Sequence, residues 1–209
     1  HAIRYHITSW MRPDGSFAAR TFKAWCNNGA YSSHGHAIAA KGLNAFPQLY
    51  PCDNIDGETW TVYTNRSVAG AMRGYGMPQA SYAFECHAED CARAMGMDPL
   101  EFRRQNLMPV GFYHAFSKNE LYSDTFNQCF DKGAEIIGYY DKVKKYAKQT
   151  GDIRRGIAVS TFWYNTAVYP IALETSSCRL VMNQDGSVQF QLGETEIGQG
   201  ADTVAAQMI

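Results

Sequence analysis

Two glycine-rich segments carry the residue types and spacing best suited to binding a ligand. The first, residues 193–200, reads Gly-Glu-Thr-Glu-Ile-Gly-Gln-Gly and connects a predicted strand to a predicted helix. Such a loop exposes backbone N–H groups and the positive end of the helix dipole, which together favour an anion. Gln199 adds a side-chain amide that donates and accepts hydrogen bonds. The glycine spacing matches neither a P-loop nor a dinucleotide fingerprint, and a tight turn without a ligand is the alternative.

The second segment, residues 68–79, reads Val-Ala-Gly-Ala-Met-Arg-Gly-Tyr-Gly-Met-Pro-Gln. Tyr75 stands between Gly74 and Gly76, so its ring has no flanking side chains to crowd it and could stack on a flat ligand. The alternative is that Tyr75 packs into a core beside a flexible turn. Arg73 could bind an anion, or it could be a surface or helix-capping charge.

Three polar residues before this segment carry a weaker signal. His34 and His36 are spaced by one and could ligate a metal, but no third ligand with fitting spacing is evident. We therefore expect hydrogen-bonded loop histidines. Lys41 is a single charge among small apolar residues, normally a solvated helix face, and a partly buried lysine here would be a functional candidate.

Composition limits the class of protein. The 209 residues include 45% hydrophobic residues, enough for a sizeable core, and 19 Lys and Arg against 20 Asp and Glu, a net charge of −1. This charge balance favours no nucleic-acid partner. No apolar run approaches the ~20 residues of a membrane span. The first ten residues alternate polar and apolar, unlike a signal peptide. We expect a cytoplasmic protein without a membrane partner.

The six cysteines are scattered and include no Cys-x-x-Cys pair, so the sequence contains no zinc ribbon or iron–sulfur ligand run. Cys86 and Cys91 lie five residues apart, which places them on different faces of a helix. We expect buried free thiols.

The elements that must position these loops predict an α+β fold of mixed hairpins and helices. Strands at 3–10 and 17–25 flank a turn at 12–16. A short helix at 36–46, interrupted by Gly42, and a strand at 59–64 follow. A helix at 79–95 ends at Gly96, and Asp98 caps a second helix that begins at Pro99.

The rest of the chain is expected to contain a helix at 124–137, capped by Ser123, and a charged surface helix or turn at 141–148. Strands are predicted at 155–164, 175–182 and 188–192, the last two joined by a turn at 183–187. A helix is predicted at 201–209. A domain change is expected between 107 and 123. The chain begins within a predicted strand and stops within a predicted helix, so we expect a fragment or one polypeptide of a larger assembly.

Four segments together resemble the xanthine dehydrogenase family of molybdenum hydroxylases. Residues 71–79 resemble its Ala-Phe-Arg-Gly-Phe-Gly-x-Pro-Gln motif, and residues 193–200 resemble its Gly-Thr-Glu-Met-Gly-Gln-Gly loop. Residues 97–107 look like the family's helix that begins with Asp-Pro, and residues 185–188 fall where the family has a hairpin. Order and spacing agree across nearly the whole chain. The chain looks most like part of the molybdenum-binding subunit of bacterial, subunit-type xanthine dehydrogenases.

The resemblance implies parts of two molybdopterin-binding domains, residues 1–112 and 113–209. It implies an oxidoreductase of purine metabolism that hydroxylates a purine or related N-heterocycle with water-derived oxygen. The implied cofactor is molybdopterin with Mo, in the plain or the cytosine dinucleotide form. The implied partners are an iron–sulfur subunit with [2Fe–2S] clusters, an FAD subunit and the rest of the molybdenum subunit, with a small heterocyclic substrate.

The resemblance also implies roles for individual residues. Arg73 places its backbone near the Mo oxo group. The cofactor-binding residues are Ala71, Met72, Arg73, Ile197, Gly198, Gln199 and Gly200. The substrate-facing residues are Tyr75 in place of a stacking phenylalanine, Lys41 in place of an arginine, and Val168 with Tyr169 in place of a second aromatic.

No catalytic residue is expected within the chain. The family's base glutamate falls beyond Ile209, and neither Glu194 nor Glu196 is that residue, so the chain alone should be inactive. Two alternatives stay open: an aldehyde-oxidising relative, and a non-catalytic assembly module of the same fold.

Overall fold

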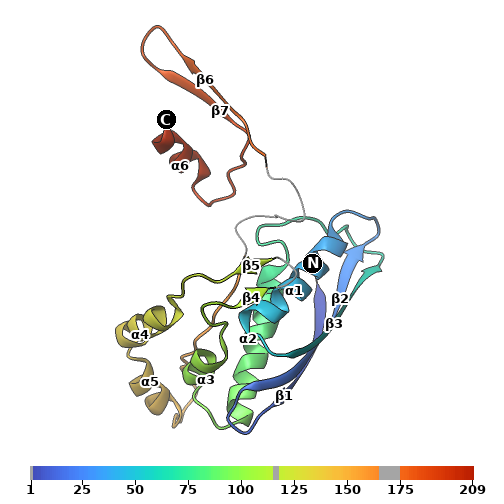
Figure 1. Ribbon diagram of the computed structural model, residues 1–209, viewed down its shortest axis with the longest axis vertical. Helices are drawn as coiled ribbons and strands as arrows, with labels where there is room; N and C mark the ends of the chain where they lie inside the picture. Colours follow the sequence, from blue (N-terminus) through green and yellow to red (C-terminus); the bar gives the residue numbers. More distant parts are fainter. Residues whose placement is uncertain (1, 115–117, 165–174) are drawn as a thin grey trace. The chain divides into compact units, whose positions relative to one another are not determined.

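The computed structural model describes residues 2–114, 118–164 and 175–209, and the chain divides into two compact units, His1–Tyr164 and Asn165–Ile209 (Figure 1). Helices and strands are mixed, which confirms the predicted α+β class. Among the described residues, no helix combines the length and apolar character that crossing a membrane requires.

The first unit is built on a three-stranded sheet in the order β1-β2-β3. Strands β1 (Ile3–Met11) and β2 (Phe17–Gly29) pair antiparallel, which confirms the predicted hairpin. The turn between them is fixed by the Asp14 carboxylate, which accepts hydrogen bonds from the backbone N–H (2.9 Å) and hydroxyl (2.7 Å) of Ser16. Strand β3 (Asn54–Tyr63) runs parallel to β2 and begins earlier than predicted.

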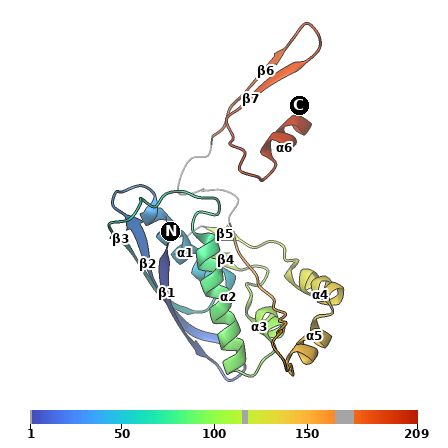
Figure 2. The same ribbon diagram turned by 180° about the vertical axis from the view of Figure 1, so that it is seen from behind.

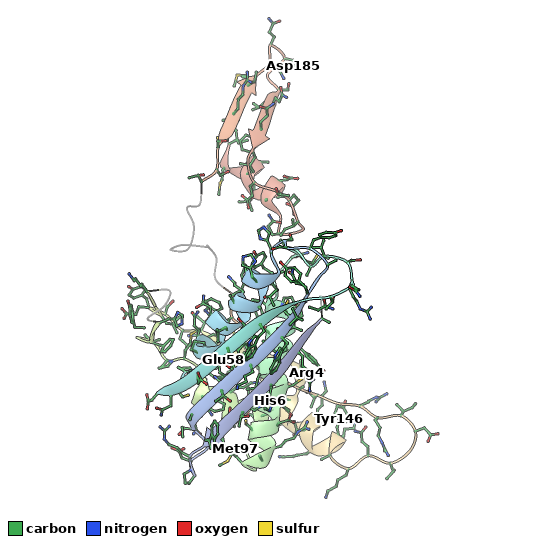
Figure 3. All side chains as sticks on the ribbon, turned by 90° about the vertical axis from the view of Figure 1, so that its right-hand side faces the viewer. Arg4, His6, Glu58, Met97, Tyr146 and Asp185 are labelled. Atoms are coloured by element: carbon green, nitrogen blue, oxygen red, sulfur yellow. The ribbon has the colours of Figure 1, made fainter. Side chains whose placement is uncertain are left out.

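Helices α1 (Gly35–Leu49) and α2 (Met77–Ala94) cover one face of this sheet, and Figure 2 shows them from behind. Phe22 of β2 packs there against Phe46 and Phe84. The other face carries polar side chains, among them Arg4, His6 and Glu58 (Figure 3). The alternation of β2 thus faces Phe22 and Ala24 toward the helices, whereas Trp25 lies on the other face and stacks on Trp60.

The predicted break of the first helix at Gly42 is wrong. Helix α1 continues through Gly42 to Leu49. A Cβ at Gly42 would lie 3.3 Å from the Cβ of Ala80 in α2, so the glycine allows the two helices to pack closely. Close packing, and not a chain break, explains this glycine.

Helix α3 (Pro99–Asn106) begins as predicted, because Asp98 accepts hydrogen bonds from the backbone N–H groups of Leu100 (2.8 Å) and Glu101 (3.3 Å). The predicted cap at Ser123 is wrong. Helix α4 (Phe126–Ile137) follows Thr125, and the Asp124 carboxylate accepts from the Phe126 N–H at 2.6 Å. Helix α5 (Tyr139–Tyr146) follows directly, and the short strands β4 (Tyr113–His114) and β5 (Asn119–Glu120) pair antiparallel.

The strand predicted at 155–164 is wrong. Residues 155–164 form no ladder with another strand. Ile157, Val159 and Trp163 instead pack against the buried cluster of the first unit. The apolar residues of this segment alternate because alternate side chains pack against the buried cluster, and the resulting pattern resembles that of a strand.

The described part of the second unit contains the hairpin β6 (Cys178–Met182) and β7 (Val188–Leu192), followed by helix α6 (Ala201–Met208). These elements confirm the predicted hairpin and helix, with β6 shorter than expected. Asp185 at the hairpin tip accepts hydrogen bonds from the N–H (2.9 Å) and hydroxyl (2.7 Å) of Ser187.

All six cysteines are free thiols, as expected, but only Cys26 and Cys91 are buried, so the expectation of burial is wrong for the other four. Cys86, Cys129 and Cys178 are exposed. Within the described residues, no group of three His, Cys, Asp or Glu side chains is arranged to hold a metal ion.

Candidate functional site

The loop that enters α2 has an unusual backbone. Gly74, Tyr75 and Gly76 have φ angles of +91°, +49° and +88°, three successive residues in the left-handed region. A Cβ at Gly76 would lie 2.6 Å from the Cγ2 of Ile38, so this loop lies directly on α1. Backbone hydrogen bonds from Tyr75 N–H to Met72 O (2.7 Å) and from Met77 N–H to Gly74 O (2.9 Å) close it. The glycines therefore place Tyr75 at a defined position.

The apex of this loop is accessible. Ala71, Met72 and Arg73 are exposed, and the Met72 side chain is 73% exposed. Within the described part of the chain, the backbone N–H groups of these three residues donate no hydrogen bond. They can therefore donate to a ligand, which suits anionic or oxo oxygen atoms.

Tyr75 is partly buried, and its hydroxyl oxygen lies 2.6 Å from Nδ1 of His34. The two rings meet edge-on, with centroids 6.0 Å apart and planes at 83°. Partial burial and the neighbouring Tyr164 raise the pKa of Tyr75, which keeps the phenol protonated. The expectation of a hydrogen-bonded loop histidine is confirmed for His34 and wrong for His36, which lies within α1. The sequence contained no signal that Tyr75 is the partner of His34.

Lys41 lies on α1, and its Nζ is 4.8 Å from the ring centroid of Tyr164 and 5.9 Å from that of Trp163. Burial lowers the pKa of Lys41. It is therefore a partly buried cation against aromatic rings, the environment that makes a lysine a functional candidate. Tyr164 lines one groove together with Gly74 and Pro78, which flank the loop of Tyr75. The first unit therefore places Lys41 and the loop that carries Tyr75 in one region.

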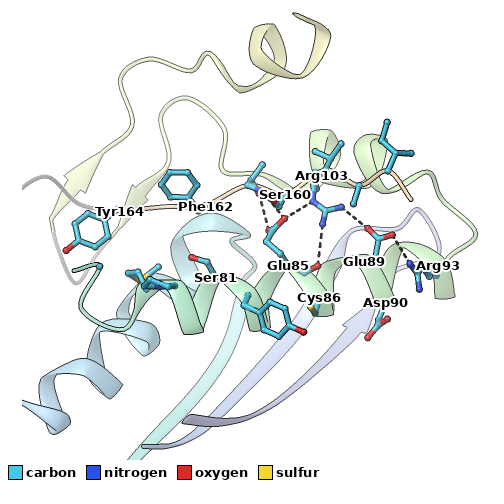
Figure 4. Close-up of a pocket in the computed structure, with 18 residues that line it drawn as sticks. Ser81, Glu85, Cys86, Glu89, Asp90, Arg93, Arg103, Ser160, Phe162 and Tyr164 are labelled. Atoms are coloured by element: carbon cyan, nitrogen blue, oxygen red, sulfur yellow. Dashed lines mark hydrogen bonds and ion pairs between the residues drawn. The ribbon is translucent and has the colours of Figure 1, made fainter. Parts of the chain in front are cut away.

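A groove of about 760 Å³ runs from this region along α2 (Figure 4). Gly74, Pro78 and Tyr164 line one part of it, and Glu85 and Arg103 line another. Its walls are the exposed face of α2 and the extended residues 157–162. The groove was not predicted, because the sequence suggested that the extended segment was a strand in a sheet.

A buried network holds the extended segment on α2. The Glu85 carboxylate accepts hydrogen bonds from Arg103 Nε (2.9 Å), from the Tyr50 hydroxyl (2.5 Å) and from the Thr161 N–H (2.8 Å). Burial, and then the Glu85 charge, raise the pKa of Tyr50. Because Thr161 lies close to Tyr164 in the chain, this network also positions the residues against Lys41.

The second predicted loop, residues 193–200, is held in place by hydrogen bonds to its own Glu196 side chain. Glu196 Oε1 accepts hydrogen bonds from the N–H groups of Gly198 (2.5 Å) and Gly200 (3.2 Å), and Oε2 accepts from Asp202 (3.2 Å). These bonds, the one from Gly200 foremost, lower the pKa of Glu196. The carboxylate therefore occupies the anion position that the sequence predicted at the start of α6. An acidic residue a few positions before a helix start was the signal for it.

Gln199 also bonds within this loop. Its Nε2 donates to Thr195 O (2.9 Å), and its Oε1 accepts from the Ile197 N–H (2.7 Å). Gln199 is exposed and borders a groove of about 410 Å³ between α6 and the hairpin. The Gln199 amide donates and accepts hydrogen bonds as predicted, but both of its partners, Thr195 and Ile197, belong to the same loop.

The predicted site residues fall in both units. Lys41, Ala71, Met72, Arg73 and Tyr75 belong to the first, and residues 197–200 belong to the second. Val168 and Tyr169 lie outside the described residues.

Two family models match the chain, both described as molybdopterin cofactor-binding domain, over residues 1–107 and 132–209. The domain boundary predicted at residue 112 lies between these ranges and stays a prediction.

Individual relatives agree with the family models. The chain is 41% identical over 209 residues to the xanthine dehydrogenase molybdenum-binding subunit of Escherichia coli O157:H7, covering 100% of this chain and 28% of that protein. It is 31% identical over 143 residues to the nicotinate dehydrogenase large molybdopterin subunit of Eubacterium barkeri, covering 66% of this chain and 34% of that one. The crystal structure of the aldehyde oxidoreductase from Desulfovibrio desulfuricans matches with a TM-score of 0.76 and 27% identity, covering 90% of this chain and 20% of that chain.

The chain thus spans 28% of the length of its Escherichia coli relative. Both family models and the identity along the whole chain bear out the resemblance found in the glycine-rich motifs. The chain belongs to the molybdopterin cofactor-binding domain family, and it corresponds to part of a xanthine dehydrogenase-like molybdenum-binding subunit.

Proposed function

We propose that this chain forms part of the molybdenum-cofactor subunit of an oxidoreductase that hydroxylates purines or related N-heterocycles with water-derived oxygen. The observation that carries the proposal is the region around Tyr164, where Lys41 offers a cation and the neighbouring glycine loop carries the Tyr75 ring. A flat, polar heterocycle fits these two features. The 41% identity to a xanthine dehydrogenase subunit supports the same substrate class.

The cofactor in this proposal is molybdopterin with Mo, and the residues present fit it. The exposed N–H groups of Ala71, Met72 and Arg73 suit oxo and phosphate oxygens, and the backbone of Arg73 would lie beside the Mo oxo group. When bound, this group takes two electrons from the substrate. The second loop would contact the pterin through its exposed backbone and the Gln199 amide, with the residues Ile197, Gly198, Gln199 and Gly200.

The chain's own residues would bind and orient the substrate. The Tyr75 ring would stack on its flat face, and Lys41 would hydrogen-bond to a carbonyl oxygen. On the resemblance of the sequence alone, we also propose Val168 and Tyr169 as substrate-facing residues. We assign no catalytic residue to this chain and propose that a base glutamate comes from another part of the molybdenum subunit.

Further partners in the proposal are an iron–sulfur subunit with [2Fe–2S] clusters and an FAD subunit, which would carry electrons away from the site. The assembly would be cytoplasmic. We further propose that the pterin carries a cytosine dinucleotide. Acid hydrolysis of the purified holoenzyme should then release a cytosine nucleotide.

The test uses the intact molybdenum subunit with its partner subunits, purified with its metal content measured. We expect oxidation of purine heterocycles, with aldehydes as poorer substrates. The match to an aldehyde oxidoreductase makes aldehyde oxidation the specific competing function. Full molybdenum content with turnover of aldehydes alone would replace the proposed function by that one, and full content with no turnover of either class would favour a non-catalytic module.

A further inference from the structure

Tyr164 contacts a predicted substrate residue and also borders the groove along α2. Its ring centroid is 4.8 Å from the Nζ of Lys41. The same side chain is 49% exposed and lines the groove together with Gly74 and Pro78. Figure 4 shows it toward the end of the groove where α2 begins. One ring therefore touches the Lys41 ammonium and borders a space that a ligand can enter.

Two anchors fix the backbone just before Tyr164. Thr161 is buried, and its N–H (2.8 Å) and its hydroxyl (3.1 Å) donate to the Glu85 carboxylate. That carboxylate is held in turn by Arg103 at 2.9 Å. Trp163 packs against the two buried apolar clusters of the first unit. Because both anchors lie within three residues of Tyr164, the position of its backbone follows from the core of the fold.

A lysine ammonium needs contacts of this kind to keep one position. It is carried on a flexible four-carbon stem that can adopt many rotamers. Lys41 is half-buried on α1, so its charge has lost part of its hydration. The negative face of an aromatic ring within ~6 Å attracts a cation and replaces some of that hydration. Tyr164 provides the nearer ring, and the ring centroid of Trp163 is 5.9 Å from Nζ.

We propose that Tyr164 is a positioning residue that holds the Lys41 ammonium beside the groove and thereby sets the preference for substrates with a ring carbonyl. This inference rests on the proposed function, in which Lys41 donates a hydrogen bond to that carbonyl. Tyr164 acts through Lys41, and its aromatic ring carries the effect without its hydroxyl.

A positioning role differs from that of a residue that only lines the groove. A simple wall residue would change substrate binding by the same factor whether or not the ammonium is present. A residue that acts through the ammonium loses its effect once the ammonium is removed. Replacing Tyr164 and Lys41 singly and together therefore separates the two roles.

The experiment measures kcat and KM of the intact holoenzyme with two substrates. Hypoxanthine is a purine with a ring carbonyl, and the single carbonyl of benzaldehyde is the group that is oxidised. Tyr164→Leu should raise the KM for hypoxanthine about 2- to 10-fold, with little change in kcat or in the KM for benzaldehyde. Tyr164→Phe should behave like wild type, because the ring remains. In the Lys41→Ala background, Tyr164→Leu should cause no further rise in KM.

Tyr122→Leu is the matched control, because Tyr122 is an exposed tyrosine that does not line this groove, and both KM values should stay unaltered. Molybdenum content of every variant shows whether the subunit has folded and loaded, and Tyr164→Gln replaces Tyr164→Leu if the latter does not load.

Two results would overturn this inference while wild type still oxidises hypoxanthine, which leaves the proposed function standing. One is an unchanged KM in Tyr164→Leu, and the other is a rise in KM of equal size with and without Lys41. If wild type oxidises no N-heterocycle, the proposed function fails, and this inference fails with it.

Discussion

The guanidinium of Arg103 donates from Nε to the Glu85 carboxylate at 2.9 Å, and the side chains are only 1% and 9% exposed. The pair joins α2 to α3, and the same carboxylate accepts the Thr161 N–H. One buried ion pair therefore fixes two helices and the extended segment that leads to Tyr164.

Replacing one partner of this pair should be strongly destabilising. Arg103→Met leaves the Glu85 charge buried without its cation, and we expect a loss of about 3–5 kcal/mol in the free energy of unfolding. Chemical denaturation of the intact subunit measures this. Lys132→Met is the control, because Lys132 and Glu135 form an exposed pair that should contribute less than about 1 kcal/mol. Equal losses in the two variants would contradict the importance of burial.

Tyr75 should lower the stability of the fold while it strengthens binding of the substrate. Its φ of +49° is unfavourable for any side chain, so Tyr75→Gly should unfold with a free energy about 1 kcal/mol higher than Tyr75→Ala. Both variants should bind a flat heterocycle about two- to tenfold more weakly than wild type, because the stacked ring is gone. Tyr75→Phe should retain that stacking contribution. Denaturation curves and dissociation constants of the four proteins check these expectations, and Tyr75→Gly no more stable than Tyr75→Ala would contradict the strain.

The loop before α6 should loosen in acid. Backbone hydrogen bonds lower the pKa of Glu196, so its charged form is the one that stabilises the loop. That contribution is fully present above the ordinary glutamate pKa and is lost as the pH falls through the lowered value in the folded protein. Amide chemical shifts of Gly198 and Gly200 should follow this titration and should move at neutral pH in Glu196→Gln. In the control Glu194→Gln the shifts should stay in place, and a flat acid titration in wild type would refute the capping role.

Lys41 should distinguish substrate classes. Lys41→Ala should reduce kcat/KM for keto-bearing heterocycles more than for simple aldehydes, because only the former carry a carbonyl in addition to the carbon that is oxidised. Burial lowers the pKa of Lys41, so its ammonium is lost at lower pH than that of an exposed lysine. The KM for keto-bearing substrates should rise as the pH rises through the lowered pKa of Lys41, and this rise should be absent in Lys41→Ala. Equal losses on both substrate classes would argue against contact with the substrate.

The sequence predicted the elements whose signals are local. The Asp98 cap, the turn at Asp14 and the hairpin with its tip at Asp185 each depend on hydrogen bonds between residues close in the chain. Gly42 and residues 155–164 were misread because their roles arise from packing against α2. Local pattern cannot distinguish a glycine at a helix contact from one that ends a helix.

The candidate site divides in the same way. The glycines around Tyr75 were visible in the sequence, whereas its partner His34 is 41 positions away and is brought there by the packing of α1 against α2. Glu196 lay within the recognised loop, but its role depends on three N–H groups that converge only after the loop has formed.

The central claim is that this chain binds a molybdenum cofactor, and molybdenum content per intact subunit tests it most directly. Gln199→Ala removes the amide that bonds to Thr195 and Ile197 and that we assign to the pterin. We expect a lower molybdenum content in Gln199→Ala than in wild type, and an unchanged content in the control Gln189→Ala, which replaces an exposed glutamine of β7. Full molybdenum content together with undiminished turnover in Gln199→Ala would contradict it.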